Sequence, residues 1–487
     1  MKVLTSLQIK NAEKSAVSNG LFSYKELMRS AAQSVYSEMK SRYKTVGKRI
    51  LIIAGSGNNG GDGIVLADLL RNTGAAVYLC FPCGEPTAEP AVEYLPAVAD
   101  LPRVYDLSGI YDFYIDALFG IGFRDSLPQN IETLIKEINH RPGVKIAIDI
   151  PSGMYADRSA SGVHFKADLT VTFIGYKQCQ ILPPDSSDCG EVVLKDLNID
   201  VKNEYNYSII EPPIPRKYSK NAHKGTFGTV LTVCGSYGMC GAGILSAKAA
   251  LIGGAGIVKS VVCSNNYPAF TSAVPEAVTV PVDTSLNGAP FLNDKRVFSA
   301  ISSADSLLIG CGLGRSDEVV NGIYKILPAI SIPTVIDADG INAVAANINI
   351  LKNVNAPLVF TPHPGEMAAL LNTTVEDVQC NRVLYAKKFA CDNQCTLVLK
   401  GANTIVASEN GEIFINITGN YGMGKGGSGD VLSGIIAALL ANGYDPLEAA
   451  KTAVYVHGAA GDAAALKYTK RTMLPTDLLE ELKFITF

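Results

Sequence analysis

The chain has 487 residues and a formal net charge of −4. This length is about twice what one hydrophobic core supports, so at least two domains are expected. The small net charge gives no reason to expect binding to nucleic acid or to an anionic membrane, and no apolar run is long enough to span a bilayer.

The N-terminal residues lack the continuous apolar core of a signal peptide. The eleven cysteines are an odd number and fall mostly inside apolar strands, which is typical of reduced, cytoplasmic proteins. Cys80 and Cys83 have the C-x-x-C spacing, but a proline lies between them and no second pair is near, which argues against a redox or metal role. We therefore expect a cytoplasmic location.

The first predicted elements are two helices, Ser6–Ser18 and Tyr24–Arg42, followed by the buried strand Arg49–Ala54. The sequence GNNGGDG follows at residues 57–63, and helical periodicity begins at Ile64. A strand, a glycine turn and a helix in this order can bind phosphate or ribose, although the pattern is not G-x-G-x-x-G. Its amide and carboxylate oxygens suit a hard cation or sugar hydroxyls. The alternative is a tight turn that favours Asn and Gly.

Two later strands of this half end in an acid. Asp116 precedes the loop ALFGIGFR, and Asp149 precedes IPSG, which contains Ser152. The carboxyl ends of strands in an open parallel sheet line the ligand crevice. The alternative is that both acids only cap the next turn. We predict one site formed by Asn58, Asn59, Asp62, Asp116, Asp149 and Ser152.

The motifs GNNGGDG, DALFGIG and DIPSG resemble, in order and spacing, the epimerase domain of the NAD(P)H-hydrate repair enzymes. The resemblance covers residues 4–197 and implies a Rossmann-like, three-layer α/β domain that interconverts the two C6 epimers of hydrated NAD(P)H. It implies a potassium ion bound by Asn59, Asp116 and Ser152, and Asp149 as the proton-transferring residue. Residues 28–32 depart from the family, which more often has an acid and a glycine there. The implied hydrate-binding residues are Asn58, Asn59, Gly60, Gly61, Asp62, Gly120, Ile121, Gly122, Phe123, Arg124, Asp125, Ser126 and Asp149.

The clearest boundary lies between residues 198 and 220. Pro212, Pro213 and Pro215 fit neither a helix interior nor a central strand. We place a linker at residues 210–217, between domains at residues 1–210 and 218–487. Both halves alternate β-branched runs with helical patterns, which predicts parallel sheets covered by helices.

The second half repeats the pattern of strands that end in glycine or polar residues, as a ligand crevice requires. A long helix is predicted at residues 241–253, after the first of these strands. His363 follows one strand between two prolines and could be a rigid loop residue. Lys400 follows another and could be a surface lysine. The strands are predicted at residues 229–234, 257–263, 306–309, 334–336, 358–360 and 396–399.

The glycine-rich sequence GKGGSGDVL at residues 424–432 leads into a helical apolar pattern. The free backbone N–H groups and the dipole of such a helix start favour an anion. Asp430 beside this anion hole suits removal of a proton from a hydroxyl. Phosphoryl transfer to a hydroxyl needs positive charge, an anion site and a base near the acceptor oxygen. The lysine that follows a late strand and this glycine-rich turn with its aspartate are residues of those kinds. The alternative is an ordinary helix start with an acidic first turn.

The motifs GCGLG, DADG, TPHPGE, LKGANT and GGSGD resemble the ribokinase-like dehydratase domain of the same repair enzymes, over residues 218–482. The resemblance implies that the S-epimer is phosphorylated on its ring hydroxyl by ADP or ATP with Mg²⁺, and that phosphate elimination then restores NAD(P)H. Asp430 would be the catalytic base. Cys311 and Ser428 replace a proline and a threonine that are frequent in the family. The implied residues are Ala242, Gly314, His363 and Asp430 for the hydrate, and Lys400, Gly401, Ala402, Asn403, Thr404, Gly426, Gly427 and Gly429 for the nucleotide.

The leading hypothesis is therefore a bifunctional repair enzyme whose epimerase supplies the S-specific dehydratase. One alternative is a small-molecule kinase of the hydroxymethylpyrimidine or hydroxyethylthiazole type, fused to a non-catalytic nucleotide-binding module. Another makes the N-terminal half a nucleotide sensor or interaction domain. The sequence leaves the choice between NADH and NADPH hydrate open, and family analogy favours ADP over ATP. We expect a homo-oligomer, since the family tends to assemble.

Overall fold

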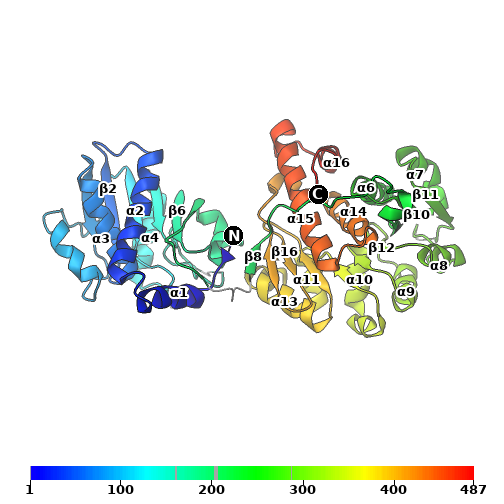
Figure 1. The fold of residues 1–487 in the computed structure, drawn as a ribbon, viewed down its shortest axis with the longest axis horizontal. Coiled ribbons are helices and arrows are strands. Elements are labelled where there is room, and N and C mark those ends of the chain that lie inside the picture. The colour runs from blue at the N-terminus through cyan, green and yellow to red at the C-terminus, as the bar shows by residue number, and fades with distance from the viewer. Residues whose placement is uncertain (1, 125, 160–161, 202–206, 287) are drawn as a thin grey trace. The chain divides into compact units, whose positions relative to one another are not determined.

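The computed structural model describes residues 2–124, 126–159, 162–201, 207–286 and 288–487. The chain forms two compact units, Met1–Tyr205 and Asn206–Phe487 (Figure 1). The division falls before the linker expected at residues 210–217, because strand β8 (Tyr207–Ile209) pairs with β17 (Ile413–Ile415) in the second unit. Within the described ranges, no helix has the length and apolarity needed to cross a membrane.

The N-terminal unit contains a six-stranded parallel sheet with the strand order β3-β2-β4-β5-β6-β7. From β2 the chain adds β3 on one side and then β4 on the other. This reversal places a ligand crevice outside the carboxyl ends of β2 and β4. The strands are β2 (Arg49–Ala54), β3 (Ala76–Cys80), β4 (Phe113–Ala117), β5 (Val144–Ile148), β6 (Leu169–Phe173) and β7 (Glu191–Lys195), after a short β1 (Lys2–Val3).

Helices cover both faces of this sheet. Ile50 and Ile52 of β2 pack into one core with α1, α2 and α3, whereas Leu51 and Ile53 face a second core with α4. This alternation follows from the two-residue period of a strand and confirms the predicted three-layer, Rossmann-like α/β architecture. The helices are α1 (Ser6–Ser18), α2 (Tyr24–Arg42), α3 (Asn58–Arg71), α4 (Gln129–His140) and α5 (Gln178–Ile181).

In the sequence GNNGGDG, Gly57 is the N-cap of α3 and residues 58–63 are already helical, whereas the sequence pattern predicted that the helix begins at Ile64. The helix begins at Asn58 because its glycines let it lie directly on the strand ends. A Cβ atom at Gly60 would be 1.8 Å from the carbonyl oxygen of Gly55, and one at Gly63 would be 2.6 Å from the Cβ of Ala117.

The substitution Gly60→Ala is expected to lower the free energy of unfolding of the N-terminal unit by about 1–3 kcal/mol, because the new methyl group overlaps a backbone oxygen. Urea unfolding followed by circular dichroism measures this change. Gly122→Ala is the matched control, since a Cβ atom there meets no atom within 4 Å. Equal stability of the two variants would contradict the close packing at Gly60.

The second unit contains a sheet with the order β8-β17-β16-β15-β14-β13-β12-β9-β10-β11. The prediction of a parallel sheet is wrong for β16, which pairs antiparallel with β15 and β17, because the short loop after β15 is a hairpin and not a crossover. The strands are β9 (Thr229–Val233), β10 (Ile257–Cys263), β11 (Val278–Val282), β12 (Ser306–Ile309), β13 (Thr334–Ile336), β14 (Leu358–Phe360), β15 (Thr396–Leu399) and β16 (Ile405–Ala407).

Helix α14 (Ser428–Ala441) is buried on nearly all sides, which explains why its sequence is apolar all round. It packs with α6 (Cys240–Ile252), α15 (Pro446–Tyr468) and α16 (Pro475–Leu482) in one core on the sheet (Figure 1). On α13 (Arg382–Asp392), Phe389 packs edge-to-face on Phe360 of β14. The remaining helices are α7 (Tyr267–Ala273), α8 (Lys295–Ile301), α9 (Asp317–Ile326), α10 (Asp339–Ala346), α11 (Pro364–Leu371) and α12 (Val375–Cys380).

Candidate active sites

The N-terminal unit has a cavity of about 890 Å³ that is lined mainly by helices α1 and α2 and by the segments that follow β2 and β4, with Asp149 after β5. Gly60 and Gly61 do not line it. Gly60 packs on Gly55, and a Cβ atom at Gly61 would be 2.5 Å from the sulfur of Met28. Asp125 lies outside the described residues. The cavity contains these predicted site residues: Asn58, Asn59, Asp62, Gly120, Ile121, Gly122, Phe123, Arg124, Ser126 and Asp149.

Asp149 is held in one orientation. Its φ of 66° is in the left-handed region, which is uncommon for a residue other than glycine. The Nε2 of Gln180 donates to its carbonyl oxygen at 2.6 Å. The Nζ of Lys177 lies 2.6 Å from its Oδ1, and the Lys177 side chain is 1% exposed. These contacts fix a carboxylate in the cavity wall, as proton transfer to a bound ligand requires.

Asp116 and Ser152 do not line this cavity, but they contact each other. The Ser152 hydroxyl donates to Oδ1 of Asp116 at 2.6 Å, and the Ser152 N–H donates to Oδ2 at 2.7 Å. Burial outweighs these hydrogen bonds and raises the pKa of Asp116 to about 6. The Ser152 hydroxyl also accepts a hydrogen bond from the N–H of Phe119 at 3.0 Å, so the pair is joined to the loop after β4.

Asn59 reaches the same loop, because a Cβ atom at Gly120 would be 3.5 Å from the Cβ of Asn59. Asn59 is only 9% exposed, and its Nδ2 finds no hydrogen-bond partner in the described part of the chain. The buried carboxylate of Asp116, the hydroxyl of Ser152 and the amide of Asn59 are oxygen donors of the kind that hard cations bind. This donor set fits a potassium ion.

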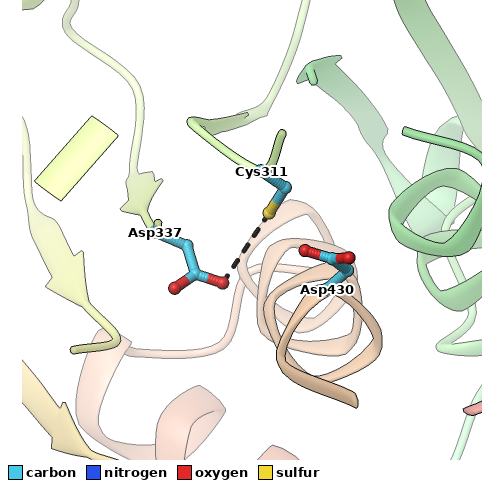
Figure 2. A group of neighbouring side chains, drawn as sticks. All are labelled: Cys311, Asp337 and Asp430. Atoms are coloured by element: carbon cyan, nitrogen blue, oxygen red, sulfur yellow. Dashed lines mark hydrogen bonds between the residues drawn. The ribbon is translucent and has the colours of Figure 1, made fainter. Parts of the chain in front are cut away.

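In the second unit, Asp430 lies in the first turn of α14, after Gly427 with a φ of 101°. One ligand atom from each of Cys311, Asp337 and Asp430 lies within 4.8 Å of the others (Figure 2). Burial and then the negative charge of Asp337 raise the pKa of Asp430 to about 7. A carboxylate with this pKa is well matched to act as a general base near neutral pH.

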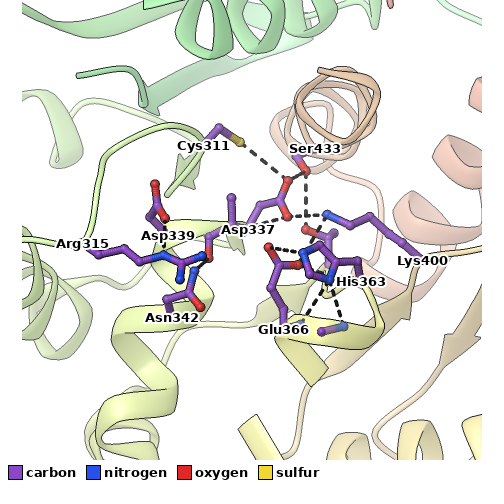
Figure 3. Close-up of polar contacts among 12 residues, drawn as sticks. Cys311, Arg315, Asp337, Asp339, Asn342, His363, Glu366, Lys400 and Ser433 are labelled. Carbon is purple, nitrogen blue, oxygen red and sulfur yellow. Dashed lines mark hydrogen bonds and ion pairs between the residues drawn. The ribbon is translucent and has the colours of Figure 1, made fainter. Parts of the chain in front are cut away.

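Lys400 is part of the site and not a surface lysine. Its Nζ lies 2.7 Å from Oδ1 of Asp337 and 3.9 Å from Oε2 of Glu366, and its side chain is 18% exposed (Figure 3). The Ser433 hydroxyl donates to Oδ2 of Asp337 at 2.6 Å. Burial acts to lower the pKa of Lys400, but the charges of Asp337 and Glu366 raise it above its usual value. The ammonium therefore stays charged.

His363 has a structural role at the start of α11. Its Nδ1 accepts hydrogen bonds from the N–H groups of Gly365 at 2.9 Å and Glu366 at 3.2 Å. Its Nε2 lies 3.3 Å from Oε1 of Glu366, and the ring remains exposed. The histidine is thus a helix cap whose exposed ring edge is available to a ligand.

The glycine loop after β12 lies against the start of α10. The N–H of Gly314 donates to Oδ2 of Asp339 at 2.8 Å, and a Cβ atom at Gly312 would be 2.8 Å from the Cβ of Ala242. Between the two acids of DADG, Ala338 has φ 49° and ψ −116°. This conformation is rare for alanine, and such strain is concentrated at functional sites.

Arg382 supports the loop of predicted nucleotide-binding residues that follows β15. It is 2% exposed and donates to the carbonyl oxygens of Ala402 at 2.7 Å and Asn403 at 3.4 Å. The Thr404 hydroxyl donates to the carbonyl oxygen of Gly401 at 3.1 Å. The loop also meets the start of α14. A Cβ atom at Gly429 would be 3.2 Å from Nζ of Lys400, whereas one at Gly426 would meet no atom within 4 Å.

Sequence reasoning did not assign a role to several of these residues. Asp337 and Glu366 lie within the motifs DADG and TPHPGE. Asp337 directly follows a strand, so the rule that strand ends line a ligand crevice identifies it as a candidate. Lys177, Arg382 and Ser433 carry no local signal, because only the tertiary packing buries them beside charged or polar partners.

Two sites, each at the carboxyl edge of an α/β sheet, define a two-domain enzyme with a phosphoryl-transfer type of site in its second unit. Comparison with known families likewise divides the chain into an N-terminal and a C-terminal part. Residues 24–179 match the family described as YjeF-related protein N-terminus, and residues 230–483 match the family described as NAD(P)H-hydrate dehydratase. The chain belongs to the family of bifunctional NAD(P)H-hydrate repair enzymes.

The relatives match over most of the length of both proteins. The bifunctional NAD(P)H-hydrate repair enzyme Nnr of Moorella thermoacetica is 35% identical, over 100% of this chain and 96% of the relative. The Escherichia coli K12 enzyme of the same name is 32% identical, over 94% of this chain and 89% of the relative.

Solved structures resemble the second unit. A ribokinase-like superfamily protein from Enterococcus faecalis V583 is 27% identical, with a TM-score of 0.50, over 57% of this chain and 95% of that chain. The ADP/ATP-dependent NAD(P)H-hydrate dehydratase of Bacillus subtilis, co-crystallised with ATP and Mg²⁺, is 28% identical over 56% of this chain and 93% of that chain, with a TM-score of 0.47. The second unit is ribokinase-like, as the sequence predicted.

Proposed function

We propose that the N-terminal unit interconverts the R and S epimers of NAD(P)H hydrate, and that the second unit dehydrates the S-epimer with ADP or ATP. The observation that carries the proposal is Asp430, a carboxyl group with a pKa of about 7 at the start of α14, beside the ion pair of Asp337 and Lys400. This arrangement combines a base for a hydroxyl group with a site for phosphate.

In the dehydratase unit, Asp430 takes the proton of the ring hydroxyl of the hydrate. The hydroxyl oxygen of the hydrate then attacks the terminal phosphoryl group of the nucleotide. The free N–H groups at Gly426, Gly427 and Gly429 bind the phosphate charge, and the loop from Lys400 to Thr404 holds the nucleotide. Elimination of phosphate then restores the dihydronicotinamide ring. Magnesium, bound to the nucleotide phosphates, would offset their charge. The carboxylate of Asp337 offers oxygen ligands of the kind that Mg²⁺ binds.

In the epimerase unit, Asp149 exchanges a proton with the C6 hydroxyl, and Lys177 keeps its carboxylate in place. Asn58, Asp62 and the loop from Gly120 to Ser126 bind the hydrate. Asn59, Asp116 and Ser152 would hold the potassium ion, which would supply positive charge next to the buried Asp116. The expectation of a homo-oligomer belongs to the same proposal, and light scattering of the purified chain tests it.

A mixture of R and S hydrated NADH, with Mg²⁺ and K⁺, tests both activities together. We would follow the return of reduced-nicotinamide absorbance with ADP, with ATP and with neither. Complete recovery that needs one nucleotide supports both activities and names the phosphoryl donor. Recovery that stops at the S fraction contradicts the epimerase, and no recovery with either nucleotide contradicts the repair function and favours a small-molecule kinase.

The raised pKa of Asp430 predicts how dehydration depends on pH. Its carboxylate form is the active base, so kcat/KM for the S-epimer should be constant above pH 7 and fall about tenfold per pH unit below it. Initial rates with saturating nucleotide, corrected for spontaneous decay of the hydrate, measure this profile. A profile that stays flat down to pH 5 would show that Asp430 is not the base.

A further inference from the structure

Glu13 lies in the wall of the N-terminal cavity, on helix α1, for which no function is predicted from the sequence. It lines the cavity together with Asp62 and Asp149. Its side chain is half-buried, and the described residues provide its carboxyl group with no hydrogen bond or ion pair. A carboxyl group withdrawn from water without a partner is unfavourable unless a ligand satisfies it.

Contacts outside the helix hold α1 in place. The Ser6 N–H and hydroxyl donate to the carboxylate of Asp157 at 2.8 and 2.6 Å, and Arg124 donates to the Ser6 hydroxyl. The N–H of Leu4 donates to the carbonyl oxygen of Tyr176 at 2.8 Å. Glu13 is therefore held in the cavity wall by an anchored helix, and it comes from a different element than Asp149.

The charges around Glu13 differ from those around Asp149. Asp149 is ion-paired with Lys177. Burial and then the negative charge of Asp149 raise the pKa of Glu13 to about 7, although Lys177 and Lys10 act to lower it. Burial, Asp149 and Glu13 raise the pKa of Asp62 well above its usual value. The cavity thus combines the ion-paired carboxylate of Asp149 with the carboxyl group of Glu13, whose pKa is near neutral.

Epimerisation at C6 of a hydrated dihydronicotinamide needs two such groups. When the ring opens, a base takes the proton of the C6 hydroxyl, the N1–C6 bond breaks, and its electron pair goes to N1. An acid gives N1 a proton, so that the products are an aldehyde and an N–H group. After rotation, N1 attacks the other face of the aldehyde, and both protons return. The reaction is balanced without any further reactant.

This inference rests on the proposed epimerase function. We propose that Glu13 is the second catalytic group of that reaction, the acid that protonates N1 while Asp149 holds the hydroxyl proton. A group that must give a proton and take it back works best with a pKa near the working pH. Glu13, with a pKa of about 7, meets this condition.

The test is epimer exchange by the full-length protein without nucleotide. Purified S-hydrate is converted to R-hydrate, the two are separated by chromatography, and the spontaneous rate is subtracted. We expect Glu13→Gln to lower kcat by about 100-fold or more with little change in KM. The decline of wild-type kcat/KM above pH 7, where Glu13 loses its proton, should be absent from the residual activity. Dehydration of the S-epimer should be unchanged, and the surface variant Glu132→Gln should behave as wild type.

Wild-type kcat in Glu13→Gln would overturn the proposal, and so would a reduced kcat that keeps the wild-type decline above pH 7. If Glu13→Gln does not fold, the variant Glu13→Asp tests the proposal instead. It keeps the carboxyl group but has a side chain that is one methylene shorter. A lower kcat with the alkaline decline retained supports the proposal, whereas an unchanged kcat overturns it. A wild-type protein that exchanges no epimers overturns the epimerase function itself, which distinguishes that failure from the failure of Glu13 alone.

Discussion

The variant Asp430→Asn is expected to dehydrate the S-epimer about 10²–10⁴-fold more slowly than the wild type, which is the usual contribution of a general base. The amide cannot accept the hydroxyl proton, but it has nearly the same shape as the carboxylate. It also removes one negative charge beside Asp337, whose charge contributes to the raised pKa of Asp430. Nucleotide affinity should therefore be kept or slightly improved, so that the loss falls on kcat.

Stopped assays with pure S-hydrate and saturating nucleotide measure this kcat, and calorimetric titration measures nucleotide binding. The matched control is Asp149→Asn in the other unit, which should lose epimer exchange and keep dehydration, while Asp430→Asn should show the reverse. If Asp430→Asn retains more than a tenth of the wild-type dehydration rate, Asp430 is not the base.

The regular elements were largely predictable because their local patterns are strong. The predicted bounds Ser6–Ser18 and Tyr24–Arg42 agree with α1 and α2, since each helix starts at a side-chain cap, Thr5 or Ser23, and has an apolar stripe. The start of α3 at Asn58 was not predicted, because its glycines are poor helix formers. Glycine is required at Gly60 and Gly63 because the helix lies directly against Gly55 and Ala117. This requirement comes from tertiary packing and not from the local sequence.

The candidate sites also contain some residues that the sequence predicts and others that it does not. Acids at strand ends, such as Asp116, Asp149 and Asp337, can be found from sequence because the sheet topology brings strand ends together. The residues that contact them cannot be found from sequence. Lys177 and Arg382 are ordinary cations of their segments, and only the fold places the first on Asp149 and the second under the loop after β15.

The variant Lys400→Met is expected to lower the free energy of unfolding of the second unit by about 3–5 kcal/mol at pH 8, the usual cost of breaking a buried ion pair. Asp337 is fully buried, and Lys400 supplies its compensating charge at 2.7 Å. Methionine fills similar space but leaves the carboxylate unpaired, since Ser433 contributes only a neutral hydrogen bond. The surface variant Lys483→Met, which loses an exposed pair with Glu480, should cost less than about 1 kcal/mol.

The loss in Lys400→Met should depend on pH with a definite sign. In the wild type, burial alone would raise the pKa of Asp337, but Lys400 and the hydrogen bonds from Ser433 and Thr361 hold it below its usual value. The ion pair of Asp337 and Lys400 therefore stabilises the fold at pH values above the pKa of Asp337 in the unfolded chain. This stabilisation is lost as the pH falls through the lower pKa of the folded state. Without Lys400, burial raises the folded pKa above the unfolded one, and protonation relieves the penalty. Urea unfolding at pH 8 and pH 5 should therefore show a smaller difference between variant and wild type at pH 5. A difference that is the same at both pH values would mean that Lys400 stabilises the unit by packing alone and not by compensating the charge of Asp337.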